Sequence, residues 1–121
     1  MSAELKAALA ALQAEPPIRK EVLVGGRPVP ICLRQMSVEM AESVYQPLRD
    51  ASGMIPPERR AEMVRGMIAA TVVNEQGERL FTVDEIVAWP NALFAKVNEL
   101  TMDVNEVPRA DDKPEGEAPN D

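Results

Sequence analysis

Few side chains in this chain of 121 residues could do chemistry. It contains no histidine and one cysteine, Cys32. Histidine is the usual general base near neutral pH and the commonest metal ligand, and a lone cysteine forms neither an internal disulfide nor a thiolate zinc site. No two carboxylates lie in an apolar context that would raise one pKa and leave the other group ionised. The sequence therefore predicts a protein that is not an enzyme and that uses no cofactor or metal.

The segment from Asn74 to Glu85 has a glycine among polar side chains, as a calcium-binding loop does. If Gly77 were the sixth position of such a loop, Val72 and Val83 would occupy the first and twelfth positions. Those two positions need carboxylate oxygens. We therefore predict a reverse turn between two elements.

The charge of the chain limits its partners. The formal net charge is −7, and the basic residues Arg59, Arg60 and Arg65 alternate with Glu58 and Glu62 at helical spacing. An acidic protein with few aromatic residues is a poor match for a nucleic-acid backbone or an anionic membrane. We predict neither as a partner.

Neither a signal peptide nor a membrane helix is predicted. The first seventeen residues lack a basic start and an unbroken apolar stretch, and the apolar run 67–73 is far shorter than the roughly 20 residues that span a bilayer. We therefore expect a cytosolic protein, in which Cys32 stays reduced.

Methionine is the unusual residue type, with seven in the chain. Several fall on or beside two predicted helices, where flexible thioethers either fill a core or adapt to varied apolar partners. Both interpretations stay open. If a partner-binding groove exists, its candidate residues are Met40, Val44, Met63 and Met67.

The chain begins with a predicted amphipathic helix over residues 2–14. Leu5, Leu9 and Leu12 recur at helical spacing, and Pro16 and Pro17 end the helix. We expect this N-terminal arm, residues 1–15, to lie on the body. The alternative is a detachable helix that binds a partner.

A β-hairpin follows, with Gly25-Gly26 as its two-residue turn. The strands 18–24 and 27–34 pair Val24 with Arg27 and collect apolar side chains on one face. That face is expected to pack against helices through Ile18, Val22, Val29, Ile31 and Leu33. Pro28 and Pro30 fall on the outer edge of the second strand, where they should deny pairing to another strand.

Helices make up most of the remainder. Ser37 is a predicted N-cap, Pro47 kinks or ends the second helix, and the third runs from Pro57 through Val72. Thr82 and Glu85 predict a capping box at Val83, and Pro90 can open a last helix from about Leu93 to Val104. The fold class is α+β, mainly helical: a hairpin and about four helices in one domain, 16–105, then a disordered acidic tail, 106–121.

Three stretches of the chain carry a family resemblance: VLVGGRPVPICLR, QMSVEMAESV and MIAATVVNEQGERLFTVDEIVAW. Over roughly Glu15 to Val107 their order and residue classes resemble the tail assembly chaperones of long-tailed bacteriophages with non-contractile tails, and of related prophages and gene transfer particles. The likeness is one of element order, and it includes no reactive residue.

The resemblance implies a chaperone that coats the tape measure protein, a long helical client, for tail tube assembly. It implies self-association in multiple copies, action in the cytoplasm of the bacterial host, and absence from the finished virion. It also implies a longer form, made by ribosomal frameshifting near the C-terminus, that recruits the tail tube protein. The alternatives are an acidic phage adaptor or inhibitor that binds a host protein and, third, a structural subunit of the virion.

Overall fold

The predicted hairpin forms around Gly25 and Gly26. The computed structural model describes residues 2–107 of the chain. Strand β1 (Ile18–Val24) runs antiparallel to β2 (Arg27–Leu33), and the two strands pair in the predicted register. Both glycines have positive φ angles, 60° and 80°. A two-residue hairpin turn requires this conformation, which glycine adopts without strain.

A third strand, β3 (Val72–Val73), pairs with β2 and completes an antiparallel sheet in the order β1-β2-β3. This corrects two predictions. The helix expected to run through Val72 ends at Thr71, and the outer edge of β2, where the prolines were expected to prevent pairing, does pair with a strand over part of its length. β3 pairs only with Cys32 and Leu33. These residues lie beyond Pro30, where the backbone N–H groups needed for pairing are present again.

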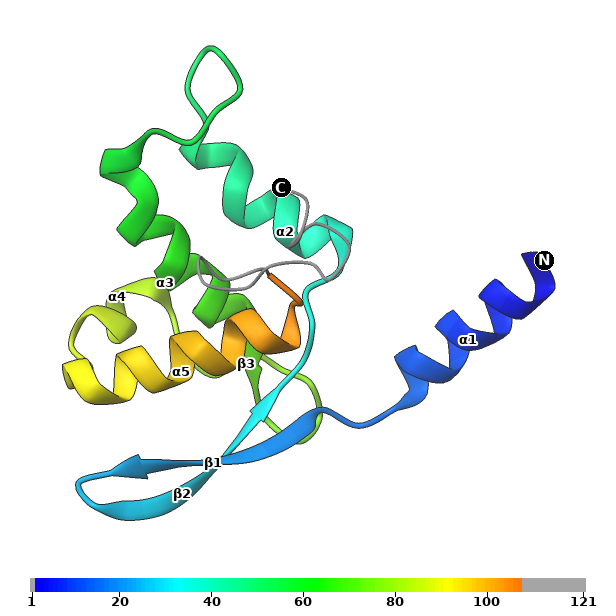
Figure 1. Ribbon diagram of the computed structural model, residues 1–121, viewed down its shortest axis with the longest axis horizontal. Coiled ribbons are helices and arrows are strands. Elements are labelled where there is room, and N and C mark those ends of the chain that lie inside the picture. The colour runs from blue at the N-terminus through cyan, green and yellow to red at the C-terminus, as the bar shows by residue number, and fades with distance from the viewer. Residues whose placement is uncertain (1, 108–121) are drawn as a thin grey trace, which may run out of the picture.

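Two helices, α2 (Val38–Tyr45) and α3 (Arg60–Thr71), form an antiparallel pair that extends away from the sheet (Figure 1). The predicted cap is confirmed, since the Met40 N–H donates to Ser37 Oγ at 3.1 Å. α2 ends at Tyr45, directly before a 3₁₀ turn, Gln46–Leu48, that contains Pro47. A second 3₁₀ turn, Pro57–Arg59, precedes α3. The helices approach closely at Gly66, where an added Cβ would lie 2.9 Å from Val44 Cγ1. Glycine permits that contact.

The capping box at Thr82 is confirmed and starts α4 (Val83–Val87). The Glu85 N–H donates to Thr82 Oγ1 at 3.2 Å, and the Thr82 N–H donates to Glu85 Oε1 at 2.9 Å. The last helix, α5 (Asn91–Val104), follows directly after Pro90, which is its N-cap residue and not its first residue.

One hydrophobic core joins the sheet to α3, α4 and α5. Its fully or nearly buried members are Val22, Leu33, Ile68, Ala69, Val72, Ile86 and Val97. The prediction for the hairpin face is confirmed at Val22 and Leu33, which are buried, and in part at Ile31, which is partly buried and packs against this core. Ile18 and Val29 are exposed, at 46% and 38%. The predicted class, α+β and mainly helical, is confirmed for residues 2–107.

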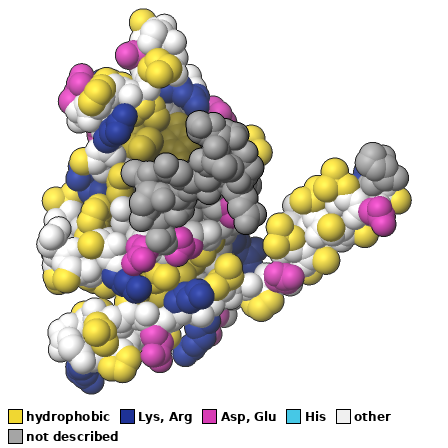
Figure 2. All heavy atoms as spheres, viewed as in Figure 1, with side chains coloured by type: hydrophobic (Ala, Val, Ile, Leu, Met, Phe, Trp, Pro, Cys, Tyr) yellow, Lys and Arg dark blue, Asp and Glu magenta, His cyan; other side chains and the backbone are white. Residues whose placement is uncertain are grey.

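Helix α1 (Ser2–Ala14) stands away from this body (Figure 1). The predicted helix is therefore present, but the expectation that it lies on the body is wrong. Residues 3–14 are all exposed, and apolar side chains run along the helix in Figure 2. We call residues 2–14 the arm.

The C-terminal boundary also differs from the prediction. Glu106 has a positive φ of 57°, and the Val107 N–H donates to the Met102 carbonyl at 2.9 Å. These contacts cap α5, so Glu106 and Val107 belong to the folded body and not to a tail. The rest of the predicted tail, 108–121, lies outside the described residues. Within residues 2–107, no helix has both the length and the apolar character to cross a bilayer.

Candidate functional site

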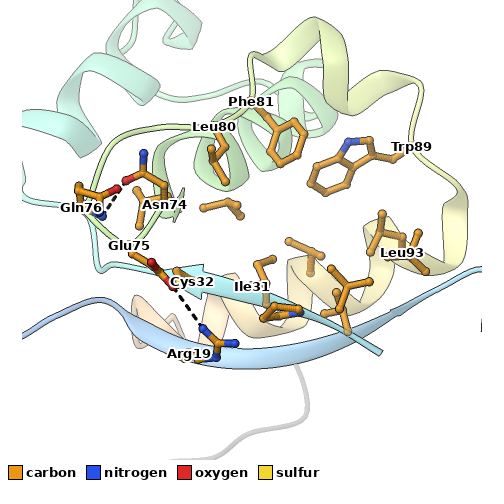
Figure 3. Close-up of a pocket in the computed structure, with 17 residues that line it drawn as sticks. Arg19, Ile31, Cys32, Asn74, Glu75, Gln76, Leu80, Phe81, Trp89 and Leu93 are labelled. Carbon is orange, nitrogen blue, oxygen red and sulfur yellow. Dashed lines mark hydrogen bonds and ion pairs between the residues drawn. The ribbon is translucent and has the colours of Figure 1, made fainter. Parts of the chain in front are cut away.

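An apolar groove of about 500 Å³ runs alongside the outer edge of β2 (Figure 3). Its floor comes from β3 and α5, and its two walls come from the hairpin and from the segment 80–89. The apolar lining residues are Val22, Val24, Val29, Pro30, Ile31, Val72, Val73, Leu80, Phe81, Trp89, Leu93 and Val97. A groove of this kind takes up the apolar side chains of a ligand or a partner protein.

The hairpin wall follows from the strand period and from the prolines. Val22, Val24, Val29 and Ile31 share one face because alternate residues of a strand point the same way. Val24 and Val29 on this face are 39% and 38% exposed, so the face stays partly open to solvent. Pro30, on the outer edge, has no N–H to offer. An incoming strand could not pair there, so this wall favours a partner that presents side chains, such as a helix.

The opposite wall is built by Leu80, Phe81 and Trp89. The rings of Phe81 and Trp89 meet edge to face, with centroids 5.0 Å apart and an interplanar angle of 88°. The short helix α4 between them, started by the Thr82 cap, brings these two residues together. Leu80 points into the groove in Figure 3, yet 51% of it is exposed. Its side chain is therefore available to a partner.

The rim of the groove carries one opposite-charge pair. Arg19 Nη1 lies 3.4 Å from Glu75 Oε2, and both side chains are largely in solvent. Exposed pairs of this kind contribute at most about 1 kcal/mol to folding. Either side chain can therefore leave this pair and bind an oppositely charged group of a partner protein with little loss of folding free energy.

The segment 74–78 at this rim forms the predicted reverse turn. Asn74 Oδ1 accepts from the N–H groups of Gln76 and Glu78, and the Gly77 N–H donates to the Asn74 carbonyl. The Asn74 oxygen is thus used within the turn. Across residues 2–107 no group of three or more His, Cys, Asp or Glu side chains could hold a metal ion.

Two titratable groups in the α2–α3 region have shifted pKa values. Burial raises the pKa of the Tyr45 phenol. A hydrogen bond from the Ser52 hydroxyl, with further bonds from the N–H groups of Met54 and Ser52, lowers the pKa of the Asp50 carboxyl. Neither residue lines the groove. A ligand or partner that binds in the groove would mainly bury apolar surface against the lining residues.

No family model, curated protein or solved structure matches this chain. The groove, the arm and the charge of the molecule are the features that bear on its function.

The four partner-binding candidates chosen from the sequence lie on the α2–α3 pair and do not line the groove. Met67 is 5% exposed, so it is a core side chain in this conformation and a partner cannot reach it. Met40, Val44 and Met63 are partly buried, and Val44 packs on Gly66. Their role in binding stays a prediction.

Sequence reasoning did not identify the groove residues as a site. Leu80 and Phe81 were visible as a short apolar pair outside any helical stripe, just before the Thr82 cap. That position was a usable signal, because these two apolar residues do not belong to a helical or strand pattern that would bury them in the core. The valines near the hairpin turn gave no such signal, since their spacing is the same as that of buried strand residues.

Proposed function

We propose that this chain is a tail assembly chaperone of a long-tailed phage, prophage or gene transfer particle, which binds the tape measure protein by apolar contacts and catalyses no reaction. The observation that carries the proposal is the open apolar groove, together with the proline-blocked edge that favours a helix over a strand. A long helical client presents apolar side chains at spacings of three and four residues, which is how a helix fills such a groove.

The charge of the protein supports the same role. A net charge of −7 keeps many copies of a small protein dispersed while their apolar surfaces are occupied. The proposal includes self-association in multiple copies, action in the cytoplasm of the bacterial host and absence from the finished virion. Mass spectrometry of purified particles tests the last point.

Co-expression with the long helical protein encoded just downstream tests the proposal. The expected result is a soluble complex that contains several copies of this chain for each client. Leu80→Glu should weaken the complex, because burial of one leucine contributes about 1.5–3 kcal/mol, or roughly tenfold or more in affinity.

Val87→Glu is the matched control. Val87 is 62% exposed, lies outside the groove lining and receives the same charge change. Client rescue should be unchanged in this variant. Met40→Glu and Met63→Glu test the α2–α3 face in the same assay. A client that stays insoluble while a host protein co-purifies in a fixed ratio would favour the adaptor or inhibitor instead.

The proposal also includes a longer form of the protein that recruits the tail tube protein, and the coding DNA tests this part. The longer form requires a slippery heptamer over the final codons and an overlapping downstream reading frame. If the coding DNA has neither, this part is wrong and the binding role is unaffected.

A further inference from the structure

The arm presents an apolar stripe that no other part of residues 2–107 covers. Leu5, Leu9 and Leu12 lie on one helical face by their spacing and are 60%, 48% and 53% exposed. A helix of thirteen residues is marginal in water even when it is rich in alanine, as this one is. The arm therefore gains stability from any surface that buries this stripe.

The base of the arm is joined to the body by a hydrogen bond. The Arg34 guanidinium donates from Nη2 to the Glu15 carbonyl at 3.1 Å. The same guanidinium stacks over Gly77, where an added Cβ would lie 3.6 Å from Arg34 Cζ. Pro16 and Pro17 stiffen the connection to β1. The arm consequently projects into solvent (Figure 1).

The groove matches the arm in shape and charge. The stretch from Leu5 to Leu12 is about 10 Å long at 1.5 Å per residue, so one groove can take two or three of its side chains. Arg19 and Glu75 are the charged residues in the groove lining. Glu4 and Lys6, the charged residues of α1, flank the leucine stripe on its two sides. Because Arg19 and Glu75 form one pair at the rim, a docked arm can place either Glu4 beside Arg19 or Lys6 beside Glu75.

We propose that the arm of one copy docks its leucine stripe in the apolar groove of a second copy. Pro30 directs the choice of occupant, because the groove edge accepts side chains of a helix and not a strand. Such a contact is heterologous, so it closes as a reciprocal dimer or continues from copy to copy. This deepens the self-association in the proposed function and does not need the client.

Sedimentation of the purified full chain over a range of concentrations tests the docking. The wild type should exceed the 13.3 kDa of one chain. Leu5→Glu with Leu9→Glu should return the mass to one chain, and so should Leu80→Glu. The matched control is Ala3→Glu with Ala7→Glu, which places two charges at the same spacing on the opposite face of α1. It should associate as the wild type does.

Mixing the two defective variants is the decisive measurement. The Leu5→Glu, Leu9→Glu chain keeps an intact groove, and the Leu80→Glu chain keeps an intact arm. Their mixture should form heterodimers, because one intact arm meets one intact groove. Circular dichroism confirms that each variant is folded.

Three results would overturn the inference. These are a wild type that stays monomeric, an arm variant that associates normally, or a mixture that fails to associate. The arm variant also separates the two proposals, since its groove is intact. It should lose self-association while it still binds the client in the co-expression assay. A wild type that self-associates but does not rescue the client would count against the proposed function alone.

Discussion

Helices α1 and α5 carry apolar stripes of nearly the same spacing, but the α5 stripe packs in the core and the α1 stripe is exposed. The α5 stripe runs through Leu93, Val97 and Leu100, and Val97 is fully buried against the sheet and α3. The α1 stripe is about half exposed along its length. The difference shows that periodicity reveals an apolar face but not what covers it. A covered stripe belongs to the core of its own domain, and an uncovered one indicates a partner.

The largest test of this comparison places the same charge in each stripe. Val97→Asp buries an unpaired carboxylate and should cost about 3–5 kcal/mol, enough to abolish cooperative unfolding in a small domain. On the Leu80→Glu background, where arm docking is absent, Leu9→Asp should change the free energy of unfolding of the body by less than about 0.5 kcal/mol. Urea denaturation measures both. Equal destabilisation by the two variants would mean that α1 packs on its own body.

A second test concerns the polar contacts that fix α5. Asn105 Nδ2 donates to Thr71 Oγ1 at 2.9 Å, and Asn105 Oδ1 accepts from the Met36 N–H at 2.7 Å. Asn105→Ala leaves both partners without this side chain and should cost about 1–3 kcal/mol. Thermal unfolding would show the loss. A change below about 0.5 kcal/mol would mean that water replaces the amide.

A third, smaller test concerns the end of α5. Glu106 occupies the left-handed region, which costs a residue with a Cβ about 1–2 kcal/mol, whereas glycine is free of that strain. Glu106→Gly should therefore stabilise the domain, by less than about 1 kcal/mol after the entropy cost of glycine. Destabilisation would show that the Glu106 side chain contributes more than its backbone strain costs.

The smallest effect is expected at the base of α1. Arg34→Ala removes the hydrogen bond to the Glu15 carbonyl. On the Leu80→Glu background, where arm docking is absent, the body should change in stability by less than about 0.5 kcal/mol. The amides of the arm should exchange with solvent faster than in the Leu80→Glu parent. Unchanged exchange would mean that the two prolines alone fix the direction of the arm.

Local signals predicted the elements well because their causes are local. The Gly25-Gly26 turn fixed the strand register, Ser37 and Thr82 placed two helix starts, and Pro47 placed a helix end. Val72 was misassigned because a valine continues a helical stripe and a buried strand equally well. Pairing with Leu33, distant in the sequence, decided between them.

The groove and the arm show where prediction from sequence stops. Val22 and Val24 share one strand face and both line the groove, yet Val22 is 5% exposed and Val24 is 39% exposed. Met67 and Met63 lie four residues apart on α3, yet only Met67 enters the core. In both cases the burial of a residue depends on contacts with elements that are distant in the sequence.

The sequence by itself determined which segments are helix or strand, where caps and turns fall and which faces are apolar. Those properties follow from backbone sterics, hydrogen bonding within a few residues and side-chain period. The tertiary structure alone decided which apolar faces are buried, which form the groove and that the arm stands free. Burial depends on contacts between residues far apart in the chain, and no local pattern records them.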